Sequence, residues 1–310
     1  SYGLPMVIYT NWGWLVAVSS GYQNATGTGH VWLLDPRDGR VVKRLDVPDN
    51  GTASSANPIG LAHMEVFFQS EREQRVTELY ATDLRGNVWR FDLSGATPAS
   101  WPSNGTKIAA VGAPITTSPA IAVNPRDRSE RWVFFGTGRL LSSSDMADTT
   151  TRTFYAIKDG SSSTPATFTT PLGRGDLVGI TSADFAPQGA GVKGWYMDMV
   201  DAGGGQITVP PHVARGVVMW ATAVPTSDPC SPGAMGVFYA REMGSARNRI
   251  ATGDLYVTMN APITKLQVAE SASTTGATNA QRKQLLIPST PGADIVVDVN
   301  LSVVLTGGRS

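Results

Sequence analysis

The stretch that decides the fold is Leu79–Gly95, which has the sequence LYATDLRGNVWRFDLSG. It predicts a strand, a tight turn at Arg85-Gly86-Asn87 and a second strand with alternating aromatic residues, because Gly and Asn between two apolar runs favour a hairpin turn. Its second half recurs in weaker copies, whose central aromatic residues are Trp32, Trp89, Tyr155 and Tyr239. The stretch is therefore a repeat unit as well as a local hairpin.

The spacing of these copies points to one architecture. The intervals are 57, 66 and 84 residues (89−32, 155−89 and 239−155), which bracket one or two units of about 40–50 residues carrying insertions. Four-stranded units of this length are the blades of a β-propeller. We predict a single all-β propeller over residues 1–310 with about seven blades and long loop insertions, in which 260–310 supplies closing strands or a tail.

The composition supports an all-β chain. There are 33 Gly and 20 Pro in 310 residues, and the apolar runs are short and rich in β-branched and aromatic residues. The expected strands are Met6–Thr10, Trp14–Ser19, Val31–Asp35, Met64–Phe68, Pro119–Val123, Trp132–Gly136, Gly194–Met199, Val217–Ala223, Asp254–Met259 and Asp294–Leu305. Only Ala280–Leu286 also fits one or two helical turns.

Charge and cysteine content exclude several classes of function. Lys+Arg and Asp+Glu both number 25, so no basic field attracts nucleic acid or an anionic membrane. No apolar run is long enough to insert directly into a membrane as a helix. Cys230 is the single cysteine, which excludes an internal disulfide and leaves open a partner cysteine elsewhere. The histidines His30, His63 and His212 lack the spacing of a zinc site.

Five stretches in order resemble one known family, the PilC/PilY type IV pilus tip-associated assembly and adhesion factors. They span about residues 14 to 245 and are Trp14–Asn24, Tyr80–Leu93, Val133–Ile157, Gly194–Asp198 and Val217–Ala240. The resemblance implies the carboxy-terminal propeller of a larger secreted protein. A first residue of Ser1, with no leader, is in keeping with a fragment or a processed form.

The resemblance also implies a function and a location. Such proteins pass through the periplasm to the cell surface and the pilus tip, promote pilus assembly or oppose retraction, and support attachment. The expected partners are minor pilins or the major pilin, and a host or abiotic surface. We expect a non-catalytic binding module, or a structural cap that presents an amino-terminal adhesion domain.

A calcium loop of the family is altered in this chain. Relatives often carry Asp-x-Asp-x-Asp-Gly-x-x-Asp before the hairpin, where alternate carboxylates and a backbone carbonyl bind the ion. The matching positions here are Gln69, Glu71, Glu73, Gln74, Arg75 and Thr77. Two longer carboxylates remain, but the first and last Asp and the Gly are replaced, and Arg72 and Arg75 stand within the loop. We therefore predict no bound calcium and no other cofactor.

Similar aromatic repeats in quinoprotein dehydrogenases give the alternative, a quinone- or ligand-binding propeller. Those rings are larger and place a catalytic Asp over the cofactor. Asp83, Asp92 and Asp198 qualify only by residue type, and capping of a turn is the simpler role for each. For partner binding, the candidate exposed aromatic residues are Trp12 and Trp101, with Trp195 more consistent with packing between blades.

Overall fold

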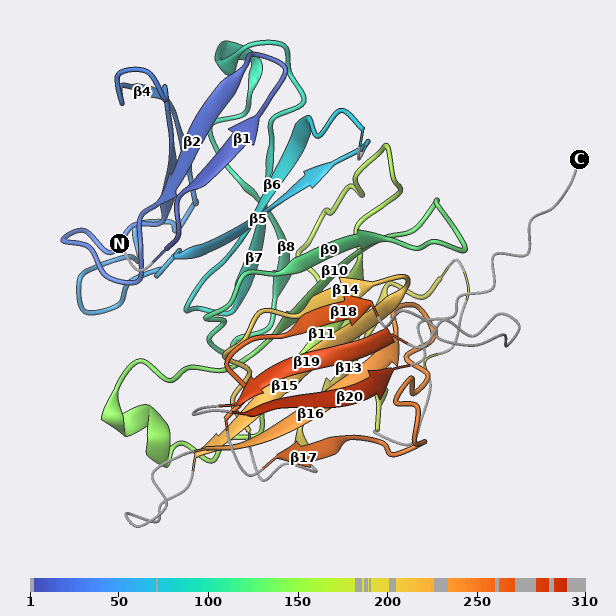
Figure 1. The fold of residues 1–310 in the computed structure, drawn as a ribbon. Helices are drawn as coiled ribbons and strands as arrows, with labels where there is room; N and C mark the ends of the chain where they lie inside the picture. The colour runs from blue at the N-terminus through green and yellow to red at the C-terminus, as the bar shows by residue number, and fades with distance from the viewer. Residues whose placement is uncertain are drawn as a thin grey trace, which may run out of the picture. The chain divides into compact units, whose positions relative to one another are not determined.

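The computed structural model describes residues 3–70, 72–181, 186, 189, 191–200, 205–225, 234–259, 262–270, 283–289 and 293–299 (Figure 1). The named helical elements are three short 3-10 turns, η1 (Pro98–Ser100), η2 (Ser143–Ala147) and η3 (Arg174–Asp176), and Val200 also has 3-10 conformation. None of the described residues forms a helix long and apolar enough to cross a membrane. The prediction of an all-β chain is confirmed.

The strands of the first half follow the expected segments closely. They are β1 (Met6–Tyr9), β2 (Trp14–Ser19), β3 (His30–Leu34), β4 (Val41–Asp46), β5 (His63–Phe68), β6 (Val76–Thr82), β7 (Asn87–Asp92), β8 (Thr106–Ala110), β9 (Ala120–Val123) and β10 (Arg131–Gly136).

The second half contributes ten further described strands. They are β11 (Thr153–Lys158), β12 (Val178–Ile180), β13 (Gly194–Asp198), β14 (His212–Ala214), β15 (Val217–Pro225), β16 (Ala234–Glu242), β17 (Val257–Met259), β18 (Gln267–Glu270), β19 (Lys283–Ser289) and β20 (Ala293–Val299). The helical alternative for 280–286 is wrong where the structure describes it, because 283–286 belongs to β19, which pairs with both β18 and β20.

These strands form five sheets, and the predicted repeat has a fixed place in four of them. The orders are β1-β2-β3-β4, β5-β6-β7-β8, β12-β13-β11-β10-β9, β14-β15-β16-β17 and β18-β19-β20. The repeated aromatic residues lie on β3, β7, β11 and β16, each the third strand of its sheet. The sequence repeat is therefore a structural repeat.

The hairpin at Leu79–Gly95 forms between β6 and β7 as predicted. Gly86 adopts φ 80°, and a Cβ there would lie 2.5 Å from the carbonyl oxygen of Ala113. Both the left-handed backbone and the close approach require glycine. The turn therefore depends on this one residue.

The described sheets number five, fewer than the expected seven or so. Five sheets from 310 residues correspond to 62 residues per sheet (310/5). The connections are long both between sheets, as at 47–62, and within one sheet, as at 159–177. The expected strand at Asp294–Leu305 is present as β20, and its residues from 300 onward lie outside the described ranges.

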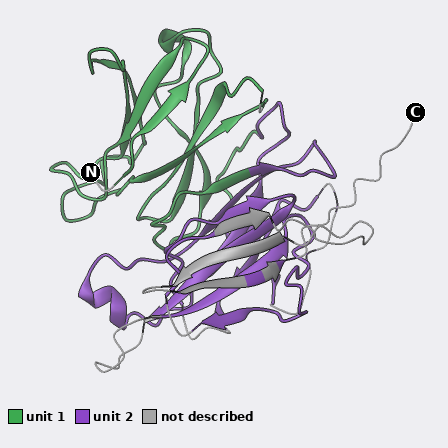
Figure 2. Cartoon of the chain, in the orientation of Figure 1, with its two compact units in different colours: residues 1–121, 167–173 green, residues 122–166, 174–310 purple. Residues whose placement is uncertain are grey.

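The chain divides into two compact units, which Figure 2 shows in green and purple. The first comprises residues 1–121 and 167–173 and contains sheets β1–β4 and β5–β8. These two sheets share one core, in which Leu15 and Leu33 belong to the same cluster as Leu79, Phe91 and Trp101. Apolar residues alternate along each strand, so one face of each sheet supplies this core.

The second unit comprises residues 122–166 and 174–310. Its core contains an aromatic stack in which the Phe154 and Trp220 rings lie 3.9 Å apart and nearly parallel, and Tyr239 follows at 5.1 Å from Trp220. All three side chains are fully buried. The aromatic repeat at Tyr239 thus packs within the core. Whether the chain forms one propeller domain stays a prediction.

Candidate functional site

The turn between β1 and β2 presents the exposed Trp12. Thr10 and Gly13 exchange two backbone hydrogen bonds of 2.9 and 3.2 Å across this turn, and Gly13 has φ 136°. The Thr10 hydroxyl accepts a further bond from the Trp12 backbone N–H. Trp12 is 38% exposed on a turn that is closed by its own backbone. The expectation that Trp12 lies at the surface is confirmed.

The altered calcium loop is attached to this hairpin. Arg75 Nη1 donates a hydrogen bond of 3.0 Å to Asn11 Oδ1, and its guanidinium carbon lies 5.8 Å from the centroid of the Tyr9 ring, close enough for a cation–π contact. Asn11 in turn donates its side-chain N–H to the Ser94 carbonyl at 2.5 Å. The structure therefore brings together Arg75 and the residues flanking Trp12. We call Tyr9, Asn11, Trp12 and Arg75 the hairpin tip cluster.

The position that matches the glycine of the family motif has a left-handed backbone in this chain. Gln74 occupies the glycine position with φ 51°, and its backbone N–H bonds the Ser70 carbonyl at 2.9 Å. Thr77, at the last Asp position, lies in β6 and donates its hydroxyl to Glu78. Glu71 lies outside the described residues.

The donor set of this loop does not fit a calcium ion. Among the described matching positions only Glu73 carries a carboxylate, and Arg75 brings a positive charge. A hard dication needs several oxygen ligands on one folded loop. The described residues also contain no group of three or more His, Cys, Asp or Glu able to hold a metal. The absence of calcium stays a prediction.

Trp101 and Trp195 are not surface residues, which corrects the expectation for Trp101. Trp101 is 2% exposed, belongs to the core of the first unit and donates its indole N–H to the Gly95 carbonyl at 2.8 Å. Trp195 is fully buried and donates to the Met243 carbonyl at 3.0 Å. A loop position in the sequence did not reveal burial, because η1 and its neighbours fold back onto the sheet.

Two of the three candidate aspartates cap turns. Asp83 accepts hydrogen bonds from the backbone N–H groups of Arg85 and Asn87 and from Trp89 Nε1 at 2.8 Å. Burial raises the pKa of the Asp83 carboxyl, and these bonds oppose the shift. Asp92 accepts from the Ser94 N–H at 2.8 Å. Both roles are as predicted.

Asp198 has a different role, so its assignment as a turn cap is wrong. It lies in β13 and forms an ion pair with Arg174, whose Nη1 lies 2.7 Å from Oδ1. Thr153 also donates its hydroxyl to Oδ1 at 2.7 Å. The bonds from Arg174 hold the pKa of the Asp198 carboxyl below its usual value. All three aspartates therefore have a structural role.

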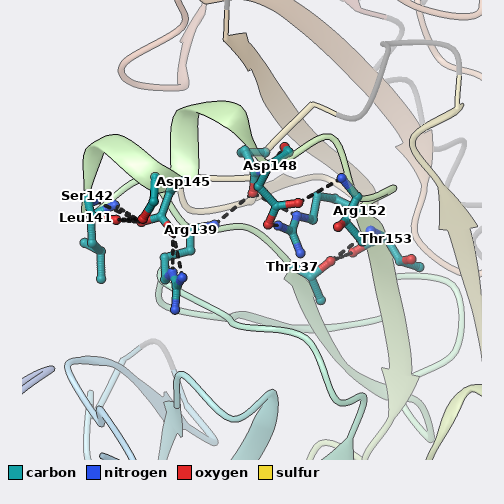
Figure 3. A network of polar contacts seen from close by, with 11 residues as sticks. Thr137, Arg139, Leu141, Ser142, Asp145, Asp148, Arg152 and Thr153 are labelled. Carbon is teal, nitrogen blue, oxygen red and sulfur yellow. Dashed lines mark hydrogen bonds and ion pairs between the residues drawn. The ribbon is translucent and has the colours of Figure 1, made fainter. Parts of the chain in front are cut away.

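A polar network in the second unit was missed at the sequence level (Figure 3). Asp145, 3% exposed, accepts hydrogen bonds from Arg139 Nε and from the backbone N–H groups of Leu141 and Ser142 at 2.7–2.9 Å. Those bonds keep the pKa of its carboxyl low despite burial. The pattern Ser142-x-x-Asp145 resembles a capping box and is the signal that could have revealed it.

The same network continues to a buried glutamine. Gln206 Oε1 accepts hydrogen bonds from the Arg139 N–H at 3.0 Å and from Arg152 Nε at 2.8 Å. Its amide group donates to the Asp148 carbonyl at 3.1 Å. These hydrogen bonds hold the 138–150 loop on its buried side, while the side chains of Leu141 and Met146 are exposed. The arrangement orders a surface loop and shows no nucleophile paired with a base among these residues.

The class of protein follows from these features. Three four-stranded antiparallel sheets and one five-stranded sheet carry the aromatic repeat on their third strand, and four-stranded antiparallel sheets are the blades of β-propellers. The model of the PilY1 beta-propeller domain matches residues 1–184, and the chain belongs to this family.

The chain is similar in sequence to proteins named as type IV pilus biogenesis factors. The chain is 27% identical over 278 residues to PilY1 of Pseudomonas aeruginosa strain PAO1, covering 72% of this chain and 23% of that protein. It is 28% identical over 211 residues to a PilY1 homolog of Xylella fastidiosa, covering 65% of this chain and 16% of the homolog. The chain therefore spans less than a quarter of the length of these relatives.

Two solved structures share the fold. The C-terminal domain of Pseudomonas aeruginosa PilY1 superposes with a TM-score of 0.73 at 18% identity, covering 97% of this chain and 72% of that one. Saccharomyces cerevisiae Sqt1 superposes with a TM-score of 0.50 at 8% identity, covering 96% and 59%. At these identities the similarity supports the fold alone.

Proposed function

We propose that this chain is a non-catalytic module of a type IV pilus biogenesis factor, and that it acts at the cell surface and pilus tip by binding minor pilins or the major pilin. In this role it promotes pilus assembly or opposes retraction, and supports attachment to surfaces. The family match over residues 1–184 is the observation that carries the proposal. It includes the whole hairpin tip cluster.

The hairpin tip cluster supports the choice of a binding surface. Trp, Tyr and Arg dominate the binding energy of protein interfaces, and the cluster contains one of each. Trp12 is exposed on a closed turn, and the contacts of Arg75 with Asn11 and Tyr9 fix the base of that turn. A surface ordered in advance loses less entropy on binding. We place pilin contact at Trp12.

A binding titration tests this placement. Soluble domains of the major and minor pilins are titrated into the purified chain and into its Trp12→Ala variant. We expect at least one pilin to bind and the substitution to weaken it by about tenfold or more. Asp38→Ala, at the exposed β3–β4 turn, is the control and retains native affinity. Equal affinity for native and Trp12→Ala protein would remove Trp12 from the interface.

The quinone-binding alternative has a simple test of its own. Absorbance is measured after quinone is added to the purified protein. We expect the spectrum to be the sum of the two separate components. A bound and reducible chromophore would favour the alternative instead.

A further inference from the structure

A short parallel strand is added to the edge of one sheet in the second unit. Three of the described sheets end at their fourth strand, whereas the sheet β12-β13-β11-β10-β9 has a fifth. This fifth strand, β12, pairs with β13 in parallel, while β13 pairs with β11 antiparallel. Since β12 belongs to the connection between β11 and β13, the chain lays part of its own connection along the edge of β13.

The side chain of Tyr196 on β13 restricts which segment fits this edge. Gly179 pairs with Tyr196, and a Cβ on Gly179 would lie 2.5 Å from the Tyr196 hydroxyl oxygen. The Arg174 guanidinium carbon lies 4.0 Å from the centroid of the same ring, which is a cation–π distance, and Arg174 Nη1 lies 2.7 Å from Asp198 Oδ1. The edge therefore accepts an extended segment that has no side chain beside Tyr196 and a cation five residues earlier (179−174).

The segment at 174–180 is held weakly for part of a sheet. Strand β12 has three residues with an exposed glycine at its centre, and only Ile180 among them is buried. Glycine loses more backbone entropy on ordering than any other residue, and parallel pairing is slightly less stable per residue than antiparallel pairing. The ion pairs Arg174–Asp198 and Lys193–Asp176 are all 31–57% exposed, so they add little stability and are screened by salt.

We propose that the edge of β13 is a docking site for an extended segment of a partner polypeptide, and that residues 174–180 occupy it until the partner displaces them. Strand addition is a recurring mode of peptide recognition, in which backbone hydrogen bonds supply affinity and side-chain pockets supply specificity. Displacement of β12 leaves a sheet of four strands, as in three other described sheets. The partner segment runs parallel to β13, with a small residue beside Tyr196 and a basic residue five positions earlier.

Hydrogen exchange tests whether the segment can leave the edge. Gly179→Val and Arg174→Gln are made separately as release variants, because the first places a Cβ against the tyrosine ring and the second removes the cation above it. Gly175→Val is the matched control, since a Cβ there meets open space. We expect exchange in β12 and β13 to accelerate about tenfold or more in both release variants and to stay native in the control. Both substituted residues are exposed, so neither change should prevent folding.

A synthetic peptide tests whether the edge accepts a segment of another chain. The peptide has the sequence of residues 173–181 and a photo-reactive group at its amino terminus. It is illuminated with the native chain or a release variant, and the linked residues are mapped by mass spectrometry. We expect cross-links on or beside β13 in the release variants at about tenfold or more the yield of the native chain, because the tethered segment no longer competes. The same peptide carrying Gly179→Val should link weakly to every form.

Any of four results would overturn the proposal. Native exchange in both release variants would make β12 a permanent strand of its sheet. Released β12 without peptide cross-links would show that the edge binds only its own segment. Equal yields from the native chain and the release variants would show that residues 174–180 do not block the edge. Equal yields from the two peptides would remove Tyr196 as the source of specificity.

Discussion

At the scale of single residues, the three histidines are the groups whose titration affects stability near neutral pH. Burial lowers the pKa of His30, His63 and His212 below the ordinary value of 6.5. A group with a lowered pKa in the folded state binds protons less readily there than in the unfolded chain. Each histidine therefore favours the folded state above pH 6.5, and this contribution is lost as the pH falls below 6.5.

We predict that the free energy of unfolding decreases between pH 6.5 and about pH 5, because the unfolded chain takes up protons that the folded chain does not. Denaturant titrations across this range measure the slope. A variant with His30, His63 and His212 all replaced by Gln should show a flatter slope, whatever its absolute stability. The same slope in both proteins would contradict the prediction.

Residue identity indicated the role of some side chains but not of others. The roles of Asp83 and Gly86 in the turn could be predicted from the sequence, because a turn imposes local requirements on its own residues. The burial of Trp101 and the ion pair between Asp198 and Arg174 were not, since both depend on residues brought together by the fold. Sequence patterns report local geometry better than tertiary contacts.

At the scale of elements, the loop at 138–150 depends on one buried carboxylate. Asp145→Ala should lower the free energy of unfolding by about 2 kcal/mol or more, because it leaves the Leu141 and Ser142 N–H groups without their acceptor. Hydrogen exchange at 139–145 should accelerate as well. Thr149→Ala, an exposed position in the same loop, is the control. Native exchange rates in Asp145→Ala would contradict this account of the loop.

The altered calcium loop makes the second prediction at this scale. Calorimetric titration of the chain with calcium should show no binding at micromolar levels, because the loop lacks the required oxygen ligands. A variant with Asp at 69, 71, 73 and 77 and Gly at 74 restores the pattern of relatives and serves as the positive control. Binding by the native chain that is lost in Glu71→Ala/Glu73→Ala would contradict the prediction.

The elements themselves were largely predictable, and their number was less so. Trp14–Ser19 is a strand with the predicted bounds, and the four aromatic copies all lie on third strands. Both the strand pattern and the aromatic repeat can be read from short, periodic stretches of the sequence. The number of sheets among the described residues was not predictable, because dividing the chain length by a mean repeat ignores long connections such as 159–177. The position of Arg75 against Asn11 and Tyr9 also required the structure, since 64 residues separate Arg75 from Asn11.

At the scale of the whole molecule, the described residues form repeated sheets. Its aromatic residues are mostly committed to packing, as in the stack of Phe154, Trp220 and Tyr239. Of its buried carboxylates, Asp83 caps a turn and Asp145 holds a loop. Among the described residues, the hairpin tip cluster is a surface feature open to a partner. This distribution supports the proposed role in binding pilins.

The central claim is a role in pilus biogenesis, and surface piliation tests it most directly. The module is deleted from the chromosomal gene, and pili on the cell surface are counted with the retraction motor present and absent. We predict few or no pili when the motor is present. Recovery without the motor would indicate that the module opposes retraction, and continued loss would indicate a role in assembly. Normal piliation in both backgrounds would contradict the account.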